Sequence, residues 1–161
     1  MSHWYINTKK VIARGDDLRL ACRSMIELVD ESFDAVGGLT MGADPFAHGI
    51  AMELGNSVAW FSVRKNQKEH GDESLVEGAD LLPGTKVLLV DDVVTLGGSI
   101  QKAYREITRF RSQIVGAVTL TDRGSSASAF FEERGVPYRS LATYHDLGIP
   151  AIEDEQVSEA V

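Results

Sequence analysis

Hydrophobic and polar residues follow two spacings that alternate along the chain. Helical spacing of apolar residues, together with helix-start signals, predicts helices over residues 16–30, 46–54, 99–111 and 126–134. Short β-branched and aromatic runs predict strands over residues 3–12, 33–37, 58–63, 87–90, 114–120 and 138–142, with a returning hairpin arm at 75–83. Because strands alternate with helices, we expect an α/β fold with a doubly wound, mainly parallel sheet and helices on both faces.

Local signals set the expected ends and the buried faces of these elements. The strand over residues 3–12 is expected at an edge of the sheet, because its alternation is only partial. Asp16 or Asp17 is expected to cap the first helix, and Ser99 and Ser126 two later helices. Gly135 is expected to end the last helix. The predicted core stripe of the first helix consists of Leu18, Cys22, Met25, Ile26 and Val29.

Composition narrows the classes of protein that fit. With 161 residues, of which 43% are hydrophobic, residues 1–161 are expected to form a single globular domain. A net charge of −8 argues against a nucleic-acid-binding surface. The lone cysteine, Cys22, excludes a disulfide framework. Without an apolar run near the roughly 20 residues that span a membrane, and without an export signal, we expect a cytoplasmic protein with no membrane contact. The acidic tail, residues 153–161, is expected to be frayed and solvated.

The most informative stretch is residues 86–99, where a buried strand is followed by two acids and a glycine-rich turn. Asp91 and Asp92 are expected at the carboxyl end of this strand, which is the edge where open α/β sheets bind ligands. The turn offers hydroxyl donors, and its glycines allow a phosphate to approach the backbone closely. The alternative is a strand that ends in a solvated acid pair and an ordinary turn.

This stretch resembles the phosphoribosyl pyrophosphate (PRPP) binding motif of type I phosphoribosyltransferases, since residues 87–99 are VLLVDDVVTLGGS. The resemblance implies a type I phosphoribosyltransferase-like fold. It also implies that the acid pair holds the ribose hydroxyls, with Asp91 counted as catalytic, and that the turn surrounds the 5-phosphate. The PRPP-binding residues implied here are Asp91, Asp92, Val93, Val94, Thr95, Leu96, Gly97, Gly98 and Ser99. PRPP-sensing transcription regulators share this motif, so the motif alone does not establish catalysis.

A second candidate anion loop lies at residues 38–45, between a predicted strand and a predicted helix. Small residues make up most of it, and Pro45 suits the first turn of a helix. Such loops serve tight packing as often as phosphate binding. In the resembled family the loop at this place gives backbone amides to the pyrophosphate of PRPP, which implies that role for Thr40, Met41 and Gly42.

Charged residues dominate positions 64–73, directly after a predicted strand. The segment has no apolar residue, so a solvated mobile loop is expected. Its spacing resembles the flexible catalytic loop of orotate phosphoribosyltransferases, which implies that pyrophosphate is contacted by Arg64, Lys65, Lys68 and His70. The same resemblance gives Lys68 and His70 catalytic roles in the neighbouring subunit's site. A homodimer is therefore expected.

Arg123 follows the predicted strand over residues 114–120. An arginine there is usually a surface ion-pair partner, but the resemblance implies that Arg123, together with Thr95, binds orotate. A planar guanidinium fork matches a carboxylate bidentately. The resemblance further implies Mg²⁺ as cofactor, held mainly through PRPP and water rather than by a protein metal site.

The resemblance covers roughly residues 4–149 and is greatest to the short bacterial branch of the family. The family's N-terminal helix and hairpin, with a lysine near the PRPP site and part of a hood over the base, are expected to be largely absent here. The function implied is Mg²⁺-dependent transfer of phosphoribose from PRPP to orotate, giving orotidine 5′-phosphate and pyrophosphate in pyrimidine (UMP) biosynthesis. The alternatives are a phosphoribosyltransferase for another base, a non-catalytic PRPP-binding regulator or paralogue, and an α/β protein whose matches are accidental.

Overall fold

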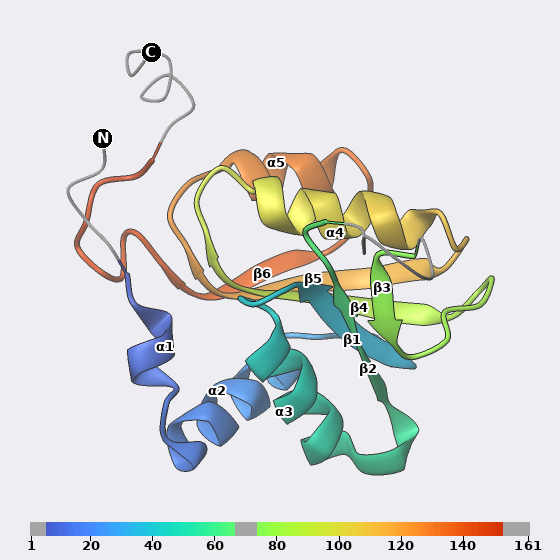
Figure 1. Cartoon of the computed structure of the whole chain (residues 1–161). Helices are drawn as coiled ribbons and strands as arrows, with labels where there is room; N and C mark the ends of the chain where they lie inside the picture. Colours follow the sequence, from blue (N-terminus) through green and yellow to red (C-terminus); the bar gives the residue numbers. More distant parts are fainter. Residues whose placement is uncertain (1–5, 67–73, 153–161) are drawn as a thin grey trace.

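A six-stranded sheet forms the centre of the protein, as a computed structural model that describes residues 6–66 and 74–152 shows (Figure 1). The strand order is β3-β2-β1-β4-β5-β6. All neighbouring strands are parallel except β2 and β3, which are antiparallel. The strands are β1 (Ala35–Leu39), β2 (Ala59–Val63), β3 (Val76–Gly78), β4 (Lys86–Val94), β5 (Gln113–Asp122) and β6 (Tyr138–Thr143). The predicted doubly wound, mainly parallel sheet is confirmed.

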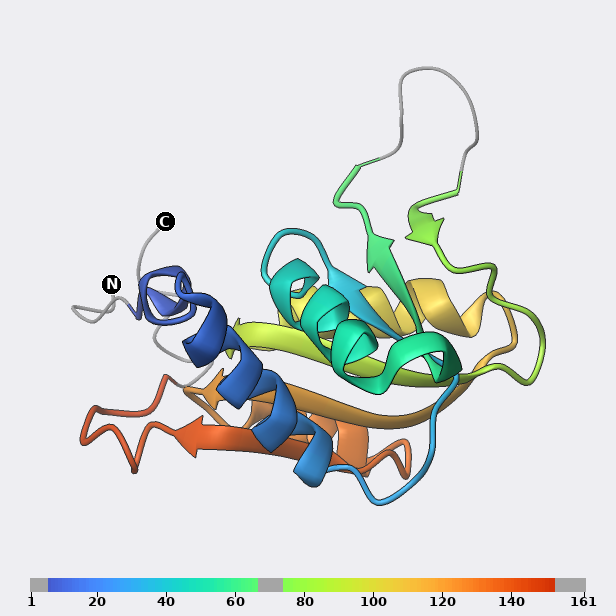
Figure 2. The ribbon, with the colours of Figure 1, turned by 90° about the horizontal axis from the view of Figure 1, so that it is seen from below.

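Two pairs of helices cover the two faces of the sheet (Figures 1 and 2). On one face lie α2 (Gly15–Glu27) and α3 (Asp44–Leu54), and a short 3₁₀ turn, η1 (Gly55–Ser57), follows α3. On the other face lie α4 (Gly98–Thr108) and α5 (Ser126–Glu132). No helix among the described residues is long and apolar enough to cross a membrane.

The sequence of β4 explains why it lies at the centre. Val87 and Leu89 pack into the core beneath α4 and α5, whereas Leu88 and Val90 pack into the core beneath α2 and α3. All four side chains are fully buried. Since successive strand residues point to opposite faces, a strand buried on both faces must be apolar without alternation.

The prediction of an edge strand over residues 3–12 is wrong for its described part. Residues 8–11 form the short helix α1 (Thr8–Val11), and residues 3–5 lie outside the described residues. The Asn7 side chain caps this helix by accepting a hydrogen bond from the Lys10 amide at 3.3 Å. Ile12 is buried while its neighbour Val11 is exposed. The capping bond and the buried Ile12 outweigh the β-propensity of the segment.

Several predicted helix ends are also wrong. α2 begins at Gly15 and ends at Glu27, so Asp16 and Asp17 lie in its first turn instead of capping it. The N-cap of α4 is Gly97 rather than Ser99, and the N-cap of α5 is Ser125 rather than Ser126; none of these caps makes a side-chain hydrogen bond. Gly97 has a φ of 77°, a left-handed conformation that glycine adopts without strain. This conformation turns the chain from β4 into α4.

Gly135 lies in the turn after α5, which ends at Glu132, two residues before the predicted end at Arg134. Its φ is 65°, and its amide donates to the Glu132 carbonyl at 3.0 Å. The Val136 amide donates to the Phe131 carbonyl at 3.0 Å, which satisfies a further carbonyl at the helix end. The acidic tail, residues 153–161, lies outside the described residues.

Candidate functional site

Two adjoining cavities lie at the carboxyl-terminal edge of the sheet, where α1 stands beyond the ends of β4, β5 and β6 (Figure 2). The first cavity is lined by Lys9, Leu39, Thr40, Met41, Gly42, Lys65, Asp91, Asp92, Val93 and Ser99. The second cavity is lined by Ile6, Asn7, Thr8, Lys9, Asp92, Val93, Thr95 and Arg123. Lys9, Asp92 and Val93 line both. The first cavity thus gathers residues from three segments that the sequence singled out, and the second joins Thr95 to Arg123.

The acid pair lies near the carboxyl end of β4, as predicted, although the strand continues to Val94, beyond the predicted end at residue 90. Asp91 is buried, and its Oδ1 accepts a hydrogen bond from the Asp92 amide at 2.9 Å. The Oδ1 of Asp92 accepts one from the Val93 amide at 2.7 Å. Its Oδ2 accepts one from the Thr8 hydroxyl at 3.1 Å. These bonds fix both carboxylates, so the alternative of a solvated acid pair is wrong.

Burial changes the acidity of Asp91. Removal from water, followed by the negative charge of Asp92, raises the pKa of the Asp91 carboxyl to about 7, and the cation of Lys65 partly opposes this. Near neutral pH the carboxyl is therefore present in both protonation states. A proton on Asp91 would turn an acceptor into a donor, so the hydrogen bonds that the first cavity offers change across this pH range.

Glycines of β1 and of the loop after it allow close approaches to two different parts of the protein. A Cβ on Gly37 would lie 2.1 Å from the Phe61 carbonyl oxygen, and one on Gly38 would lie 2.1 Å from the Val90 carbonyl oxygen, so both permit tight strand packing. A Cβ on Gly42 would instead meet the carboxylate oxygens of Asp92 at 2.5 Å and Asp91 at 2.8 Å. Gly42 thus lets the loop approach the acid pair.

Replacing Gly42 with alanine is expected to weaken binding of a phosphate ligand in the first cavity by about tenfold. The new methyl group would displace carboxylate oxygens that backbone amides hold in place, at a cost of about 1–3 kcal/mol. Calorimetric titration with PRPP measures the change. Gly15→Ala is the matched control, because open space surrounds Gly15. Equal affinity in both variants would contradict the assigned role of Gly42.

Residues 64–66 and 74–76 form the two stems of the basic segment. The first two cations of this segment, Arg64 and Lys65, have different surroundings. Lys65 lines the first cavity. Arg64 is held at the stem, since its guanidinium donates to the Asn66 carbonyl at 3.0 Å and pairs with Glu77 at 3.3 Å. Its amide donates to the Leu75 carbonyl at 2.8 Å, joining the two stems. Lys68 and His70 lie outside the described residues.

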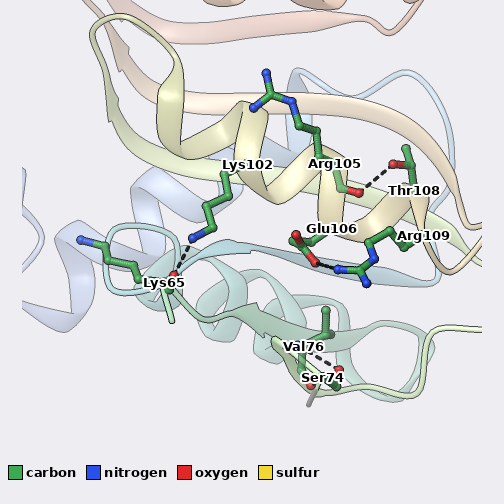
Figure 3. Close-up of polar contacts among 8 residues, drawn as sticks. All are labelled: Lys65, Ser74, Val76, Lys102, Arg105, Glu106, Thr108 and Arg109. Atoms are coloured by element: carbon green, nitrogen blue, oxygen red, sulfur yellow. Dashed lines mark hydrogen bonds and ion pairs between the residues drawn. The ribbon is translucent and has the colours of Figure 1, made fainter. Parts of the chain in front are cut away.

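Lys102 of α4 supports this stem. Its ammonium donates to the Lys65 carbonyl, and Figure 3 shows the Lys65 side chain extending away from α4. On the returning side, the Ser74 hydroxyl accepts a bond from the Val76 amide at 3.2 Å (Figure 3). The bond from Lys102 thus ties the backbone of Lys65 to α4, the helix that begins at the glycine-rich turn.

Residues 94–99, at the end of β4 and in the glycine-rich turn, lie partly in the cavity walls and partly in the core. Ser99 lines the first cavity and Thr95 the second. Val94 is buried in the core, and its carbonyl accepts the Arg123 amide at 2.8 Å. This bond connects the turn after β4 to the turn after β5, so the ends of the two neighbouring strands are held together.

Arg123 is buried, with 4% of its surface exposed, so it is not the surface ion-pair partner that its sequence position would usually suggest. Hydrogen bonds of the Asp122 side chain hold the turn that carries Arg123. The Tyr138 hydroxyl donates to Asp122 Oδ2 at 2.8 Å, and Asp122 Oδ1 accepts the Gly124 amide at 3.0 Å. Burial raises the pKa of the Asp122 carboxyl. Arg123 therefore enters the wall of the second cavity from a rigid turn.

Sequence analysis missed the contribution of α1 to this site. Thr8 lines the second cavity, and Lys9 lines both. The signal was the asparagine at position 7, a good helix cap, followed by two lysines. The segment that was predicted to be an edge strand therefore supplies a lysine to both cavities.

Comparison with known proteins assigns the family. A model of the phosphoribosyl transferase domain family matches residues 12–130. Orotate phosphoribosyltransferase of Corynebacterium glutamicum is 38% identical over 147 residues, which cover 91% of this chain and 79% of that protein. The chain belongs to the orotate phosphoribosyltransferase family. It is therefore a pentosyltransferase by family, as the sequence motifs indicated.

Solved structures of this family have the same fold. Orotate phosphoribosyltransferase of Mycobacterium tuberculosis in complex with PRPP has a TM-score of 0.77 and 34% identity, covering 90% of this chain and 84% of that one. A phosphoribosyltransferase of Corynebacterium diphtheriae has a TM-score of 0.82 and 32% identity, covering 92% and 87%. The predicted type I phosphoribosyltransferase fold is confirmed.

Proposed function

We propose that this member of the orotate phosphoribosyltransferase family transfers phosphoribose from PRPP to orotate, forming orotidine 5′-phosphate and pyrophosphate in pyrimidine biosynthesis. The observation that carries the proposal is the pair of adjoining cavities. One combines an acid pair, a close backbone loop and cations, and the other contains a buried arginine. A phosphorylated sugar and a carboxylate-bearing base need these two environments side by side.

In this proposal PRPP occupies the first cavity. Asp91 and Asp92 accept hydrogen bonds from the ribose hydroxyls, because carboxylates are acceptors only. The 5-phosphate lies on the turn over residues 95–99, where the amides at the start of α4 favour an anion. Pyrophosphate lies against the loop over residues 40–42 and Lys65, with Lys68 and His70 completing its surroundings, while Arg64 pairs with Glu77 at the stem.

Orotate occupies the second cavity in this proposal, with its carboxylate on Arg123 and a further polar contact to Thr95. Two parallel N–H···O bonds from a guanidinium give both charge and orientation. Because Asp92 and Val93 line both cavities, the base would meet the ribose at their junction. In the proposed arrangement the ring nitrogen of the base would meet the anomeric carbon of PRPP at this junction.

The proposed reaction is a dissociative substitution at the anomeric carbon. Negative charge grows on pyrophosphate as it departs, so cations around its oxygens stabilise the transition state more than the bound substrate. The acid pair holds the ribose while the bond breaks. Closure of the segment over residues 64–73 would exclude water, which would otherwise hydrolyse PRPP.

Mg²⁺ is part of the proposal as an ion carried mainly by PRPP and water. The acid pair fits this arrangement, because three of its oxygens already accept hydrogen bonds from Thr8 and backbone amides while its negative charge remains close to the ligand. A hydrated hard cation needs no dedicated protein cage. When bound, Mg²⁺ would neutralise part of the pyrophosphate charge.

We also propose a homodimer, in which Lys68 and His70 of one subunit complete the site of the other. The single domain over residues 1–161 and the cytoplasmic location remain predictions from the sequence.

The proposal is tested by mixing the purified protein with PRPP, Mg²⁺ and orotate and following orotate absorbance. Protein-dependent loss of absorbance is expected, and it should slow strongly in a Lys68→Ala variant. If the protein binds PRPP by calorimetry but orotate is not consumed, the orotate assignment is wrong. A screen of other bases would then separate a different transferase from a PRPP-binding regulator.

A further inference from the structure

Tyr138 lines neither cavity, yet its hydroxyl bonds to the residue beside Arg123. It is the first residue of β6, and the hydroxyl donates to Asp122 Oδ2 at 2.8 Å. The hydroxyl of the buried Thr119 lies 3.3 Å from the Tyr138 hydroxyl. Burial raises the pKa of the Tyr138 hydroxyl, so its proton stays in place for the bond to Asp122. A donor outside the site therefore holds a side chain next to the arginine of the second cavity.

The ring of Tyr138 is itself fixed in the core beneath α4 and α5. It stacks on the fully buried Phe131, with ring centroids 5.4 Å apart and planes inclined by 10°. The Phe131 ring in turn meets Tyr104 of α4 edge to face at 5.9 Å. The hydroxyl thus reaches Asp122 from a ring that packing already holds in one orientation.

The Asp122 carboxylate spans the backbone of Arg123. Its Oδ2 accepts the Tyr138 hydroxyl, and its Oδ1 accepts the Gly124 amide at 3.0 Å, one residue beyond Arg123. A bond from an aspartate to the amide two residues further on closes a local turn. Asp122 is buried, so removal of the Tyr138 hydroxyl would leave a carboxylate oxygen without this donor and away from water. The carboxylate would then rotate and weaken the bond that closes the turn.

Backbone bonds limit how far this turn can move. The Arg123 amide donates to the Val94 carbonyl at 2.8 Å, and the Arg123 carbonyl accepts the Ile152 amide at 2.7 Å. The Asp122 carbonyl accepts the Tyr144 amide at 2.9 Å. These bonds keep the main chain of Arg123 near its place. We therefore expect the Asp122 side chain to adjust the direction of the guanidinium, without collapse of the second cavity when it is disturbed.

We propose that Tyr138 is a positioning residue for Arg123, and that through Asp122 it sets the direction from which the guanidinium meets the carboxylate of the base. The inference rests on the proposed function, because it requires that Arg123 binds the base. Both N–H···O bonds of a bidentate pair must be aligned, so a small rotation weakens both. A displacement of about 1 Å can cost on the order of a hundredfold in rate, and the backbone bonds of the turn reduce the expected loss to roughly tenfold.

The test replaces Tyr138 with phenylalanine, which keeps the stacked ring and removes only the hydroxyl. We expect kcat/KM for orotate to fall roughly tenfold, mainly through a higher KM, while Kd for PRPP stays within about twofold. Steady-state kinetics and calorimetry measure the two effects. Tyr104→Phe is the matched control, since Tyr104 packs on the same Phe131 ring and lines neither cavity. It should change kcat/KM by less than about twofold.

A double-mutant cycle shows whether Tyr138 acts through Arg123. In an Arg123→Gln background, the further change Tyr138→Phe should alter kcat/KM by less than about twofold, because the group that it positions is absent. Equal losses in both backgrounds, or a parallel loss of PRPP affinity, would show a general structural role and overturn the inference. If Tyr138→Phe does not fold, Thr119→Val makes the same test, with a smaller expected loss of about threefold, because it removes the other contact of the tyrosine hydroxyl.

The wild-type protein separates failure of this inference from failure of the proposed function. A wild type that binds PRPP but does not convert orotate contradicts the proposed function, and the positioning role falls with it. A wild type that converts orotate, together with a Tyr138→Phe variant as efficient as Tyr104→Phe, overturns this inference alone.

Discussion

Replacing Arg123 with glutamine is expected to lower kcat/KM for orotate by roughly a thousandfold while leaving Kd for PRPP within about twofold. Arg123 lines the second cavity only, so PRPP in the first cavity should not depend on it. Its side chain is buried, and a substrate carboxylate that loses a bidentate cationic partner there is left in a poorly solvated place. Steady-state kinetics with orotate and calorimetry with PRPP measure the two effects.

Two further variants show whether the loss of orotate efficiency comes from the geometry of the guanidinium or from its charge. Arg123→Lys keeps the charge but lacks the planar fork, so it should recover only about tenfold of the lost efficiency. Arg109→Gln is the control, because Arg109 is an exposed residue of the α4 end that pairs with Glu106. An Arg123→Gln variant that converts orotate with wild-type efficiency would favour a phosphoribosyltransferase for another base.

The central strands could be predicted because their burial determines their composition. β4 contributes side chains to both cores, and only a continuous apolar run such as residues 87–90 meets that requirement. The parallel order then brings the ends of β1, β4 and β5 to one edge of the sheet. Asp91, Gly42 and Arg123 lie close to this edge for that reason, although their roles came from the resemblance to a family.

Helix α1 could not be predicted because its decisive contact is distant in the sequence. Thr8 donates to Asp92, 84 residues further along the chain, and no local pattern contains that bond. The segment over residues 3–12, which contains α1, is rich in aromatic and β-branched residues, and such a composition favours a strand. Tertiary contacts outweighed that preference, and the lysine that follows Thr8 was placed at the site as a result.

The cap of α4 was missed for a different physical reason. Serine is a strong cap in general, so Ser99 was the natural choice. The turn after β4 instead needs a residue with positive φ, and Gly97 meets that need two positions earlier. The backbone requirement of the turn, not side-chain capping, sets the start of the helix.

Replacing Asp91 with asparagine is expected to stabilise the protein at pH 8 and to have little effect on stability near pH 4. The pKa of Asp91 is raised from 3.8 to about 7, so between these values the native state holds a proton that the unfolded chain releases. Stability therefore falls as pH rises through this window, by on the order of 4 kcal/mol in total. Asparagine stays neutral over this pH range, so the variant should not lose unfolding free energy in this way. Denaturant unfolding at both pH values measures it, with the exposed Asp17→Asn variant as control.

The same replacement should weaken PRPP binding by about a hundredfold at pH 8. A charged carboxylate accepts a ribose hydroxyl, whereas an amide is a weaker, neutral partner that can present a donor instead. In the wild type, ionisation of Asp91 should strengthen PRPP binding as pH rises through about 7, and the Asp91→Asn variant should lack this contribution. Stability and ligand affinity are thus expected to change in opposite directions over one pH range, because the buried carboxylate that costs folding energy when ionised is also the proposed acceptor for the sugar. An Asp91→Asn variant that binds PRPP normally would show that Asp91 does not hold the sugar, and one whose stability follows the wild-type pH profile would show that Asp91 does not set the pH dependence of stability.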